Sequence, residues 1–408
     1  MLRQFSVIVT VAIFWQLASF STLAETKDPQ QADKFPPSPL EITTPDPLLP
    51  SLRGKRPLTL PERLKLEAAL DELNQQAAAT LQAGDKVTAF EIWNRELRLR
   101  RYLGVVAEVQ ALSRVGDIAW RQSDRQEVQY INQRLQAIEK QAQRKNKNAQ
   151  SSVDLELLQA LGDAYQKLRS PKPAIAIYNQ VLAVMRQQQN AVGEVDTLKT
   201  IGELHLSWFD YPPAATIYEE LLKSATAQDE LTYLQKLAYI YQQTKQPEKS
   251  IDVLSKLKTI YAQQNNLTRL PSLQLEIGAN YETLARENPI LLQAAFRNYQ
   301  EAYTTAWQLQ QYTRAAEAIQ KLIPLYRSQG QINEALQAGK ILVETESLAA
   351  NFYGMMQAYD QIGQLYLVQK EYSQAIAAFQ RGLELAKQLK HQEAYFTQQI
   401  EKVPQVKF

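Results

Sequence analysis

The stretch that decides the fold is Leu161-Gly162-Asp163-Ala164-Tyr165, which is followed by Ala174 and then by Tyr178. The same residue types return near the other end of the chain, at Gly363, Tyr366, Ala375 and Phe379. In both places the aromatic, alanine and second aromatic residues follow the glycine by 3, 12 and 16 residues. A spacing kept this strictly predicts a repeated structural unit.

Six further copies follow the same spacing, and each has a small residue in the glycine column or in the alanine column. The glycine column holds Ala77, Gly116, Gly162, Gly202, Ala238, Gly278, Ile323 and Gly363. The alanine column holds Ala89, Val128, Ala174, Ala214, Ser250, Ala295, Ala335 and Ala375. Small residues are needed where two helices cross closely, and aromatic side chains fill the space beside them. The pattern therefore favours paired helices over an unrelated helical bundle.

The repeat is long. Ala77 and Gly363 are 286 residues and seven steps apart, so one repeat has about 41 residues, whereas the common helical-pair repeat has about 34. The copy at Gly278 fits only with an insertion of about five residues around 287–291. Glutamine-rich stretches at 185–190 and 261–266 are expected to lengthen the second helices or to widen the loops between repeats.

The Leu-Gly-x-x-Tyr…Ala-x-x-x-Phe pattern resembles the signature of tetratricopeptide (TPR) repeats, over about residues 62–400. The resemblance implies an all-α fold, a right-handed TPR-type helical-repeat solenoid of about eight helix pairs. Such a solenoid presents a surface to other molecules. We therefore expect the function to be recognition of a protein or peptide partner.

Composition agrees with a helical array. Apolar residues make up 45% of the chain and charged residues 22%, with only 13 glycines in 408 residues. The formal net charge of +2 gives no general attraction to nucleic acid. Stacked repeats bury their faces only against neighbours, so one continuous array is expected despite the length of the chain.

The N-terminal sequence predicts export. Arg3 precedes the apolar run 5–20, and small residues at 21–24 precede Glu25. We divide the chain into a signal peptide at 1–24, a proline-rich linker at 25–61 and the TPR solenoid at 62–408. A retained membrane anchor is the alternative. Because the chain has no cysteine, it has no residue to carry a lipoprotein's lipid.

The linker holds nine of the 18 prolines, which prevent helix and favour extended backbone. We expect part of it, in particular Asp46-Pro-Leu-Leu-Pro50, to pack against the first repeat. Thr59-Leu-Pro-Glu62 has the spacing of a capping box, with threonine as the N-cap and glutamate three residues later. The first helix should begin there.

No catalytic motif is present. The chain lacks a phosphate-binding glycine loop, a nucleophile elbow and a His-Glu-x-x-His run. The two histidines do not suggest a metal site, because His205 occupies an aromatic position of its repeat and His391 falls in a polar C-terminal stretch. We predict that the protein is not an enzyme and has no catalytic residues.

In TPR folds the residue after the glycine column points into the concave groove, and here three consecutive repeats carry a carboxylate. The predicted partner-binding residues are Asp117, Asp163, Glu203 and Tyr239, with Gln166 and Lys199 beside them. The three carboxylates suit a basic peptide, and they are weak candidates for ligands of a divalent cation such as Mn²⁺.

The competing interpretation of these carboxylates is a set of ordinary intrahelical ion pairs with residues four positions away, namely Asp117–Arg121, Asp163–Lys167 and Lys199–Glu203. Chaperone-binding TPR domains need asparagine at the second groove position of a repeat. This chain has an acid there, for example Asp163 in the repeat whose first groove position is Gln159, so binding of a chaperone tail is disfavoured.

One segment is rich in arginine. Residues 89–101 carry Arg95, Arg98, Arg100 and Arg101 beside the aromatic residues Phe90 and Trp93. The arginines exceed what packing of a helix requires. They suit an acidic partner or lipid headgroups, which would give peripheral membrane association, and the alternative is a solvated helix face.

Four segments resemble exported TPR proteins of cyanobacteria and related plastid proteins, in particular the processing-associated class. They are Asp46–Pro50, Ala69–Asn74, Phe90–Arg95 and Arg114–Trp120. The resemblance implies a periplasmic factor in photosystem II biogenesis that binds the C-terminus of the D1 precursor and supplies manganese. The thylakoid lumen is the second choice of compartment, and a general envelope scaffold without a metal role is the alternative function.

We predict that the mature chain begins at Glu25, because the small residues before it fit a signal-peptidase site. N-terminal sequencing of the protein purified from its own cells measures this directly. An intact Met1 in a cytosolic fraction would remove both the leader and the photosystem role.

Overall fold

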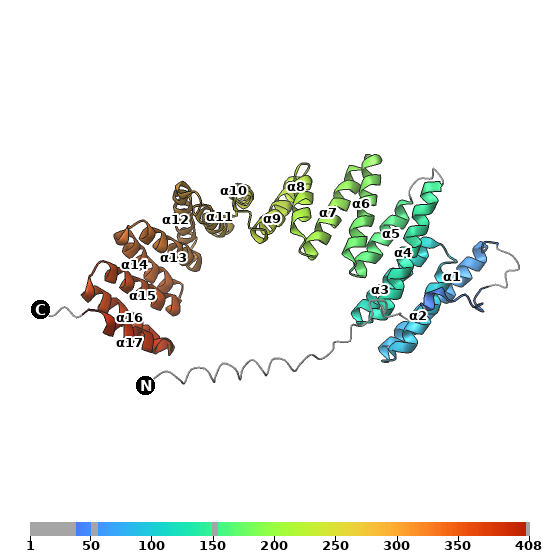
Figure 1. Ribbon diagram of the computed structural model, residues 1–408, viewed down its shortest axis with the longest axis horizontal. Coiled ribbons are helices and arrows are strands. Elements are labelled where there is room, and N and C mark those ends of the chain that lie inside the picture. Colours follow the sequence, from blue (N-terminus) through green and yellow to red (C-terminus); the bar gives the residue numbers. More distant parts are fainter. Residues whose placement is uncertain (1–37, 50–55, 149–153, 405–408) are drawn as a thin grey trace, which may run out of the picture. The chain divides into compact units, whose positions relative to one another are not determined.

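The structure is a computed structural model that describes residues 38–49, 56–148 and 154–404, with the backbone alone for 145–148. Within these ranges the chain forms seventeen α-helices, three 3₁₀ helices and no strand (Figure 1). The predicted all-α class is confirmed. The predicted signal peptide lies outside the described residues.

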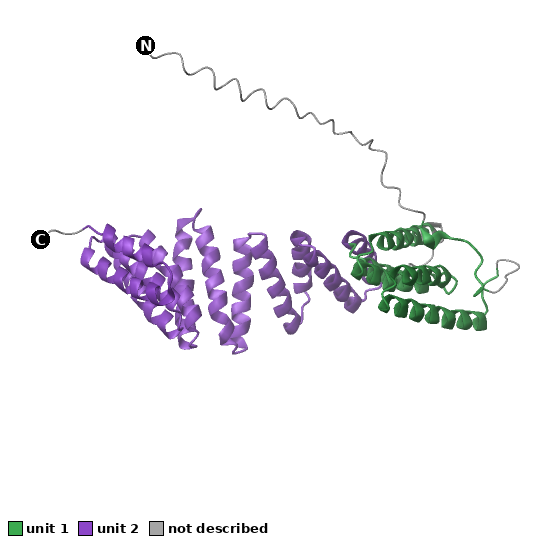
Figure 2. Cartoon of the chain, turned by 90° about the horizontal axis from the view of Figure 1, so that it is seen from below, with its two compact units in different colours: residues 1–170 green, residues 171–408 purple. Residues whose placement is uncertain are grey.

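The chain divides into two compact units, residues 1–170 and 171–408, which Figure 2 shows in different colours. The first unit contains η1 (Pro39–Glu41), α1 (Leu60–Gln82), α2 (Lys86–Arg100), α3 (Val105–Arg121), α4 (Arg125–Asn148) and α5 (Leu155–Lys167). The second begins with α6 (Pro171–Gln187), α7 (Ala191–Ser207), α8 (Tyr211–Leu222), α9 (Ala227–Gln243) and α10 (Pro247–Gln263). It continues with η2 (Leu267–Arg269), α11 (Leu270–Leu284), η3 (Pro289–Leu291), α12 (Leu292–Gln308), α13 (Tyr312–Ser328), α14 (Ile332–Leu348), α15 (Phe352–Val368), α16 (Tyr372–Leu389) and α17 (Glu393–Lys402).

The helices match the sequence columns. Each residue of the glycine column lies on an odd-numbered helix from α1 to α15, and each residue of the alanine column lies on the helix that follows. The insertion predicted at 287–291 contains η3, between α11 and α12. The boundary between the units falls between α5 and α6, so the continuity of the stack across it stays a prediction. The residues by which this repeat exceeds the common 34-residue repeat lie in both helices of the pair. First helices such as α7 and second helices such as α10 each have 17 residues.

The first helix begins as the capping box predicts. Glu62 Oε2 accepts hydrogen bonds from the backbone N–H and from the hydroxyl of Thr59, both at 2.8 Å. Arg56 donates to the same carboxylate. These bonds satisfy donors that a helix start would otherwise leave unpaired.

Most consecutive helices are joined by three-residue turns whose middle residue has a positive φ. In the turn 208–210, Phe209 has φ 59° and the N–H of Asp210 donates to the carbonyl of His205 at 2.9 Å. This is a Schellman-type closure, which usually takes glycine. Here glycine fills the position only at Gly84 and Gly330 among the described turns of this kind, and the others carry Ser, Arg, Gln, Lys, Asn, Ala or Phe.

The glycine column permits close contact within a pair. A Cβ on Gly278 would lie 2.6 Å from the ring of Tyr299, and one on Gly202 would lie 3.1 Å from the ring of Tyr218. Both rings are almost completely buried. The aromatic side chain of the second helix therefore occupies the space that the missing side chain of the first helix leaves free.

The last helix, α17, covers α16. Phe396 is 1% exposed and lies against Gly382, in a small core with Phe379 and Val403. A terminal helix with a polar outer face is what an end of a repeat array requires. No described helix has the length and apolarity needed to span a membrane.

Replacing Gly278 by Ala should destabilise the second unit by about 1–3 kcal/mol, because the new methyl group would overlap Tyr299. In an unconstrained helix the same change would stabilise by about 1 kcal/mol. Chemical unfolding of Gly278→Ala in the wild-type and Tyr299→Leu backgrounds tests the cause. The destabilisation should disappear in the second background, and an equal loss in both would show that the ring is not responsible.

Candidate functional site

The six predicted partner-binding residues are divided between the two units. The first unit carries Asp117 on α3 and Asp163 and Gln166 on α5, and the second carries Lys199 and Glu203 on α7 and Tyr239 on α9. A single site that includes all six stays a prediction, and each unit is described by itself.

In the first unit, a polar cavity of about 250 Å³ opens between α3 and α5, the first helices of the second and third repeats. Asp163 lies in its wall. The full lining is Gln110, Ser113, Glu156, Gln159, Ala160, Asp163 and Lys167. Ser113, Gln159 and Asp163 are therefore brought together in one cavity, whereas Asp117 pairs with Arg121 on its own helix, as the competing interpretation expected.

Ser113 is the unusual member of this cavity. Its side chain is 4% exposed, and its hydroxyl oxygen has no hydrogen-bond partner in the described part of the protein. A buried hydroxyl without a partner is destabilising by about 1–3 kcal/mol. A buried hydroxyl without a partner needs an explanation, and a water molecule or a polar group bound in the cavity would supply the missing bond.

Of the seven residues that line this cavity, only Asp163 was among the predicted partner-binding residues. The signal was available, because Glu156, Gln159, Asp163 and Lys167 are spaced by three and four residues and so share one face of α5. The sequence-based prediction used only the residues nearest to the glycine column. It therefore did not include Glu156 and Lys167, which lie at the two ends of that face.

In the second unit, one predicted ion pair is wrong. Lys199 does not pair with Glu203 on α7; its Nζ lies 3.2 Å from Asp229 on α9. Glu203 instead accepts from the hydroxyl of Tyr218 at 2.8 Å and pairs with Lys236 of α9 at 2.9 Å. The reason is that α9 carries an acid and a base opposite these two residues, so each finds its partner on another helix.

Tyr239 belongs to an exposed aromatic group. Its ring lies 6.0 Å from that of Tyr211, with the two hydroxyls 3.3 Å apart, and the ring of Phe209 follows at 6.3 Å from Tyr211. Phe209 is 71% exposed although it occupies a left-handed turn position. Neither Phe209 nor Tyr211 was predicted.

The described residues contain no group of three or more His, Asp or Glu side chains arranged to hold a metal ion. Two of the three candidate metal ligands already have cationic partners, because Asp117 pairs with Arg121 and Glu203 with Lys236. The geometry therefore offers Mn²⁺ no chelating cluster among these residues. His205, the aromatic-column histidine, is half-buried and has its Nδ1 2.9 Å from Asp210.

The arginine-rich segment of α2 is neither a solvated face nor an open site for lipid or an acidic partner. Arg95 binds Asp46, while Arg98 and Arg101 donate to backbone carbonyls of residues 39 and 40. The segment of the linker that was expected to pack against the first repeat is thus bound by these arginines. The sequence-based prediction missed these contacts because the partners lie 49, 59 and 61 residues earlier in the chain.

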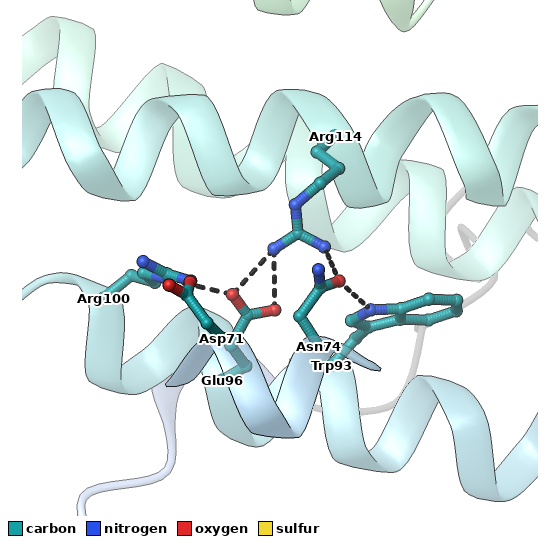
Figure 3. A network of polar contacts seen from close by, with 6 residues as sticks. All are labelled: Asp71, Asn74, Trp93, Glu96, Arg100 and Arg114. Carbon is teal, nitrogen blue, oxygen red and sulfur yellow. Dashed lines mark hydrogen bonds and ion pairs between the residues drawn. The ribbon is translucent and has the colours of Figure 1, made fainter. Parts of the chain in front are cut away.

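Arg100 enters a second network, which Figure 3 shows between α1, α2 and α3. Its centre is Glu96, which is fully buried and accepts from Arg100 at 2.9 Å and from Arg114 at 2.7 and 2.8 Å. The outer members are Asp71, which accepts from Arg100, and Asn74, which accepts from Trp93 and Arg114.

A buried carboxylate is tolerated only when it is paired and hydrogen-bonded. Asp71, Asn74, Trp93 and Arg114 supply the contacts around Glu96 and between the helices that carry it. Their role in this structure is to join the first three helices.

A second buried carboxyl group, that of Glu127, accepts fewer hydrogen bonds than Glu96 does. Glu127 on α4 is 5% exposed and accepts one hydrogen bond, from Asn94 at 3.0 Å, while its other oxygen has no partner. Burial raises the pKa of Glu127 to about 7, and the nearby carboxylate of Asp124 adds to the rise in pKa. The side chain therefore changes its charge near neutral pH.

Paired helices that bury a column of small residues, with a polar cavity between two of the first helices, are typical of a repeat scaffold for binding other proteins. Residues 155–184 and 357–389 match the family model of the tetratricopeptide repeat. These two segments therefore carry TPR repeats, and the paired helices are consistent with a helical-repeat solenoid. No curated protein sequence matches the chain.

Solved structures with similarity to the chain include other repeat proteins. A crystal structure of MamA is 23% identical over 47% of this chain and 96% of its own, with a TM-score of 0.35. Aspartyl phosphate phosphatase F from Bacillus subtilis is 15% identical over 72% and 78%, with a TM-score of 0.38. A STAND-class signal-transduction ATPase from Pyrococcus horikoshii with a TPR sensor is 13% identical over 85% and 52%, with a TM-score of 0.38. Likenesses of this size carry no argument about function.

Glu127 should make stability depend on pH. Its folded-state pKa of about 7 lies above the ordinary 4.5, so the folded state binds the proton more tightly than the unfolded state. The stabilisation is complete below pH 4.5 and is lost as the pH rises through 7. Between pH 5 and pH 8 the loss should be about 2 kcal/mol.

Urea unfolding of wild type and Glu127→Gln across this range measures the effect as the difference between the two profiles. The matched control is Glu67→Gln, because Glu67 is exposed on α1. A difference profile that is flat between pH 5 and pH 8 would contradict the assignment.

Proposed function

We propose that the chain is an exported protein-interaction scaffold that holds an extended segment of a client protein along the first helices of its repeats. The α3–α5 cavity receives one side chain of that segment. The observation that carries the proposal is the unpartnered, buried hydroxyl of Ser113 in a cavity with polar walls.

The size of the cavity argues for a side chain over a free small molecule. Its volume of about 250 Å³ is below the roughly 300–1,000 Å³ typical of small-molecule sites. Glu156 and Asp163 outnumber the single base Lys167, and the remaining polar groups are amides and a hydroxyl. Acceptors in excess suit a client group that donates hydrogen bonds, such as the ammonium of lysine or the guanidinium of arginine.

The finer proposal names the client. The resemblance of four segments to the processing-associated class, together with the predicted signal peptide, supports a periplasmic factor that docks the D1 precursor during photosystem II biogenesis. The thylakoid lumen is the second compartment. Delivery of manganese stays a prediction that rests on the same resemblance, and any Mn²⁺ bound through Asp117, Asp163 and Glu203 would be held weakly at separate carboxylates. A general envelope scaffold is the competing function.

Ser113→Ala should weaken client binding about three- to tenfold, because it removes one hydrogen bond to the client. The same variant should be at least as stable as wild type, because it also removes a buried hydroxyl that has no partner when the site is empty. Peptides selected from a displayed random library against the purified full chain supply the probe. A synthetic peptide of the D1 precursor C-terminus is assayed beside them by fluorescence anisotropy.

The selected peptides should be enriched in lysine and arginine and should lose affinity for Glu156→Gln/Asp163→Asn. The matched control, Glu67→Gln/Glu72→Gln, removes the same charge from exposed positions of α1. Equal affinity of both double variants would overturn the cavity as the site. If library peptides bind as expected and the D1 peptide does not, the scaffold function stands and the D1 assignment fails.

A further inference from the structure

Residues 38–49 contact the first unit at two points. Leu40 is 1% exposed and lies with η1 against α2 and α4. Leu48 and Leu49 pack against the leucine cluster of α1 and α2, which contains Leu66, Leu70, Leu73 and Leu99. The residues between the two points, 41–45, are exposed. The segment therefore has two anchors joined by a bridge.

The first anchor is recognised through its backbone. Arg98 Nη1 donates to the carbonyl of Pro39 at 2.8 Å, and Arg101 Nη2 donates to the carbonyl of Leu40 at 2.7 Å. Arg98 lies in the last turn of α2, and Arg101 is the C-cap residue that follows the helix. Because proline has no N–H and a fixed φ, a proline-bounded segment presents such carbonyls with little loss of conformational freedom.

The second anchor is recognised through a carboxylate. Arg95 binds Asp46 with two parallel hydrogen bonds, Nε to Oδ2 at 2.8 Å and Nη2 to Oδ1 at 2.9 Å. This fork geometry selects a planar carboxylate. Asp46 also accepts from the N–H of Leu48 at 3.0 Å, which holds the turn that delivers the two leucines.

We infer that the arginine face of α2, with the sockets for Leu40 and for Leu48 and Leu49, is a peptide-binding site that the chain fills with its own residues 38–49. The site takes an extended, proline-bounded segment with a leucine six residues before an aspartate. Arginine contacts to carbonyls and to one carboxylate, together with leucine sockets, are the features of a peptide receptor. Another chain that carries a segment of this chemistry binds by displacing the resident one.

Tethering explains why the resident segment holds the site. A ligand joined to its receptor by a short linker has an effective concentration of about 1 mM. A detached peptide of the same sequence therefore competes against that concentration. If the detached peptide binds the empty site with a dissociation constant of about 100 µM, competition from the resident segment should raise its apparent dissociation constant about tenfold.

The test uses the full chain and a fluorescent peptide of residues 38–49. In the variant Leu40→Ala/Asp46→Asn the resident segment is weakened and the receptor residues are unchanged, so the peptide should bind this variant about tenfold more tightly than wild type. Adding Arg95→Gln to the variant should reduce peptide binding at least fivefold. A peptide with the same two substitutions is the matched control and should not bind.

Circular dichroism of each variant checks that the helices are kept. Hydrogen exchange provides a second measurement that needs no variant, because excess unlabelled peptide should increase exchange at the amides of Leu48 and Leu49 in the wild-type chain. The inference is overturned if the folded double variant does not bind the peptide, or binds it no better than wild type. It is equally overturned if excess peptide leaves exchange at Leu48 and Leu49 unchanged.

Discussion

The contact between a glycine on the first helix of a pair and an aromatic ring on the second is the constraint on which the rest of the fold depends. It sets how closely the two helices cross, and it also fixes polar groups at the surface. The hydroxyl of Tyr299 donates to Glu282 at 2.8 Å, and that of Tyr218 donates to Glu203 at 2.8 Å. A ring that fills the core of a pair thus orients a carboxylate on the first helix of that pair.

The first unit adds buried charge to this plan. Glu96 and Glu108 are almost completely buried and are bound by Arg100, Arg114 and Arg134. Buried ion pairs of this kind add little to stability compared with well-packed apolar residues, but removing one partner is strongly destabilising. They therefore fix which helices meet and in what register, a role that the regular aromatic columns perform in the second unit.

The sequence was sufficient for the fold because the small and aromatic columns record local helix contacts at constant spacing. It was less informative about the surface. Whether Lys199 pairs with Glu203 or with Asp229 depends on the neighbouring helix, and a search for pairs four residues apart does not include that helix. The prediction for the arginines at 95–101 failed for the same reason, since Asp46 and Leu40 lie 49 and 61 residues from their partners, in a proline-rich segment. The sequence also did not reveal where the turns lie. Residues such as Phe209 and Lys245 occupy the positive-φ position at which a glycine would have indicated the end of a helix.

The length of the repeat has a consequence for the breadth of the binding face. Most helices of the second unit have 17 residues, which corresponds to about 26 Å along the axis. An extended chain crosses that width in about eight residues. Each repeat is therefore wide enough for a client strand to run parallel to its helix, so that neighbouring repeats can bind separate strands side by side.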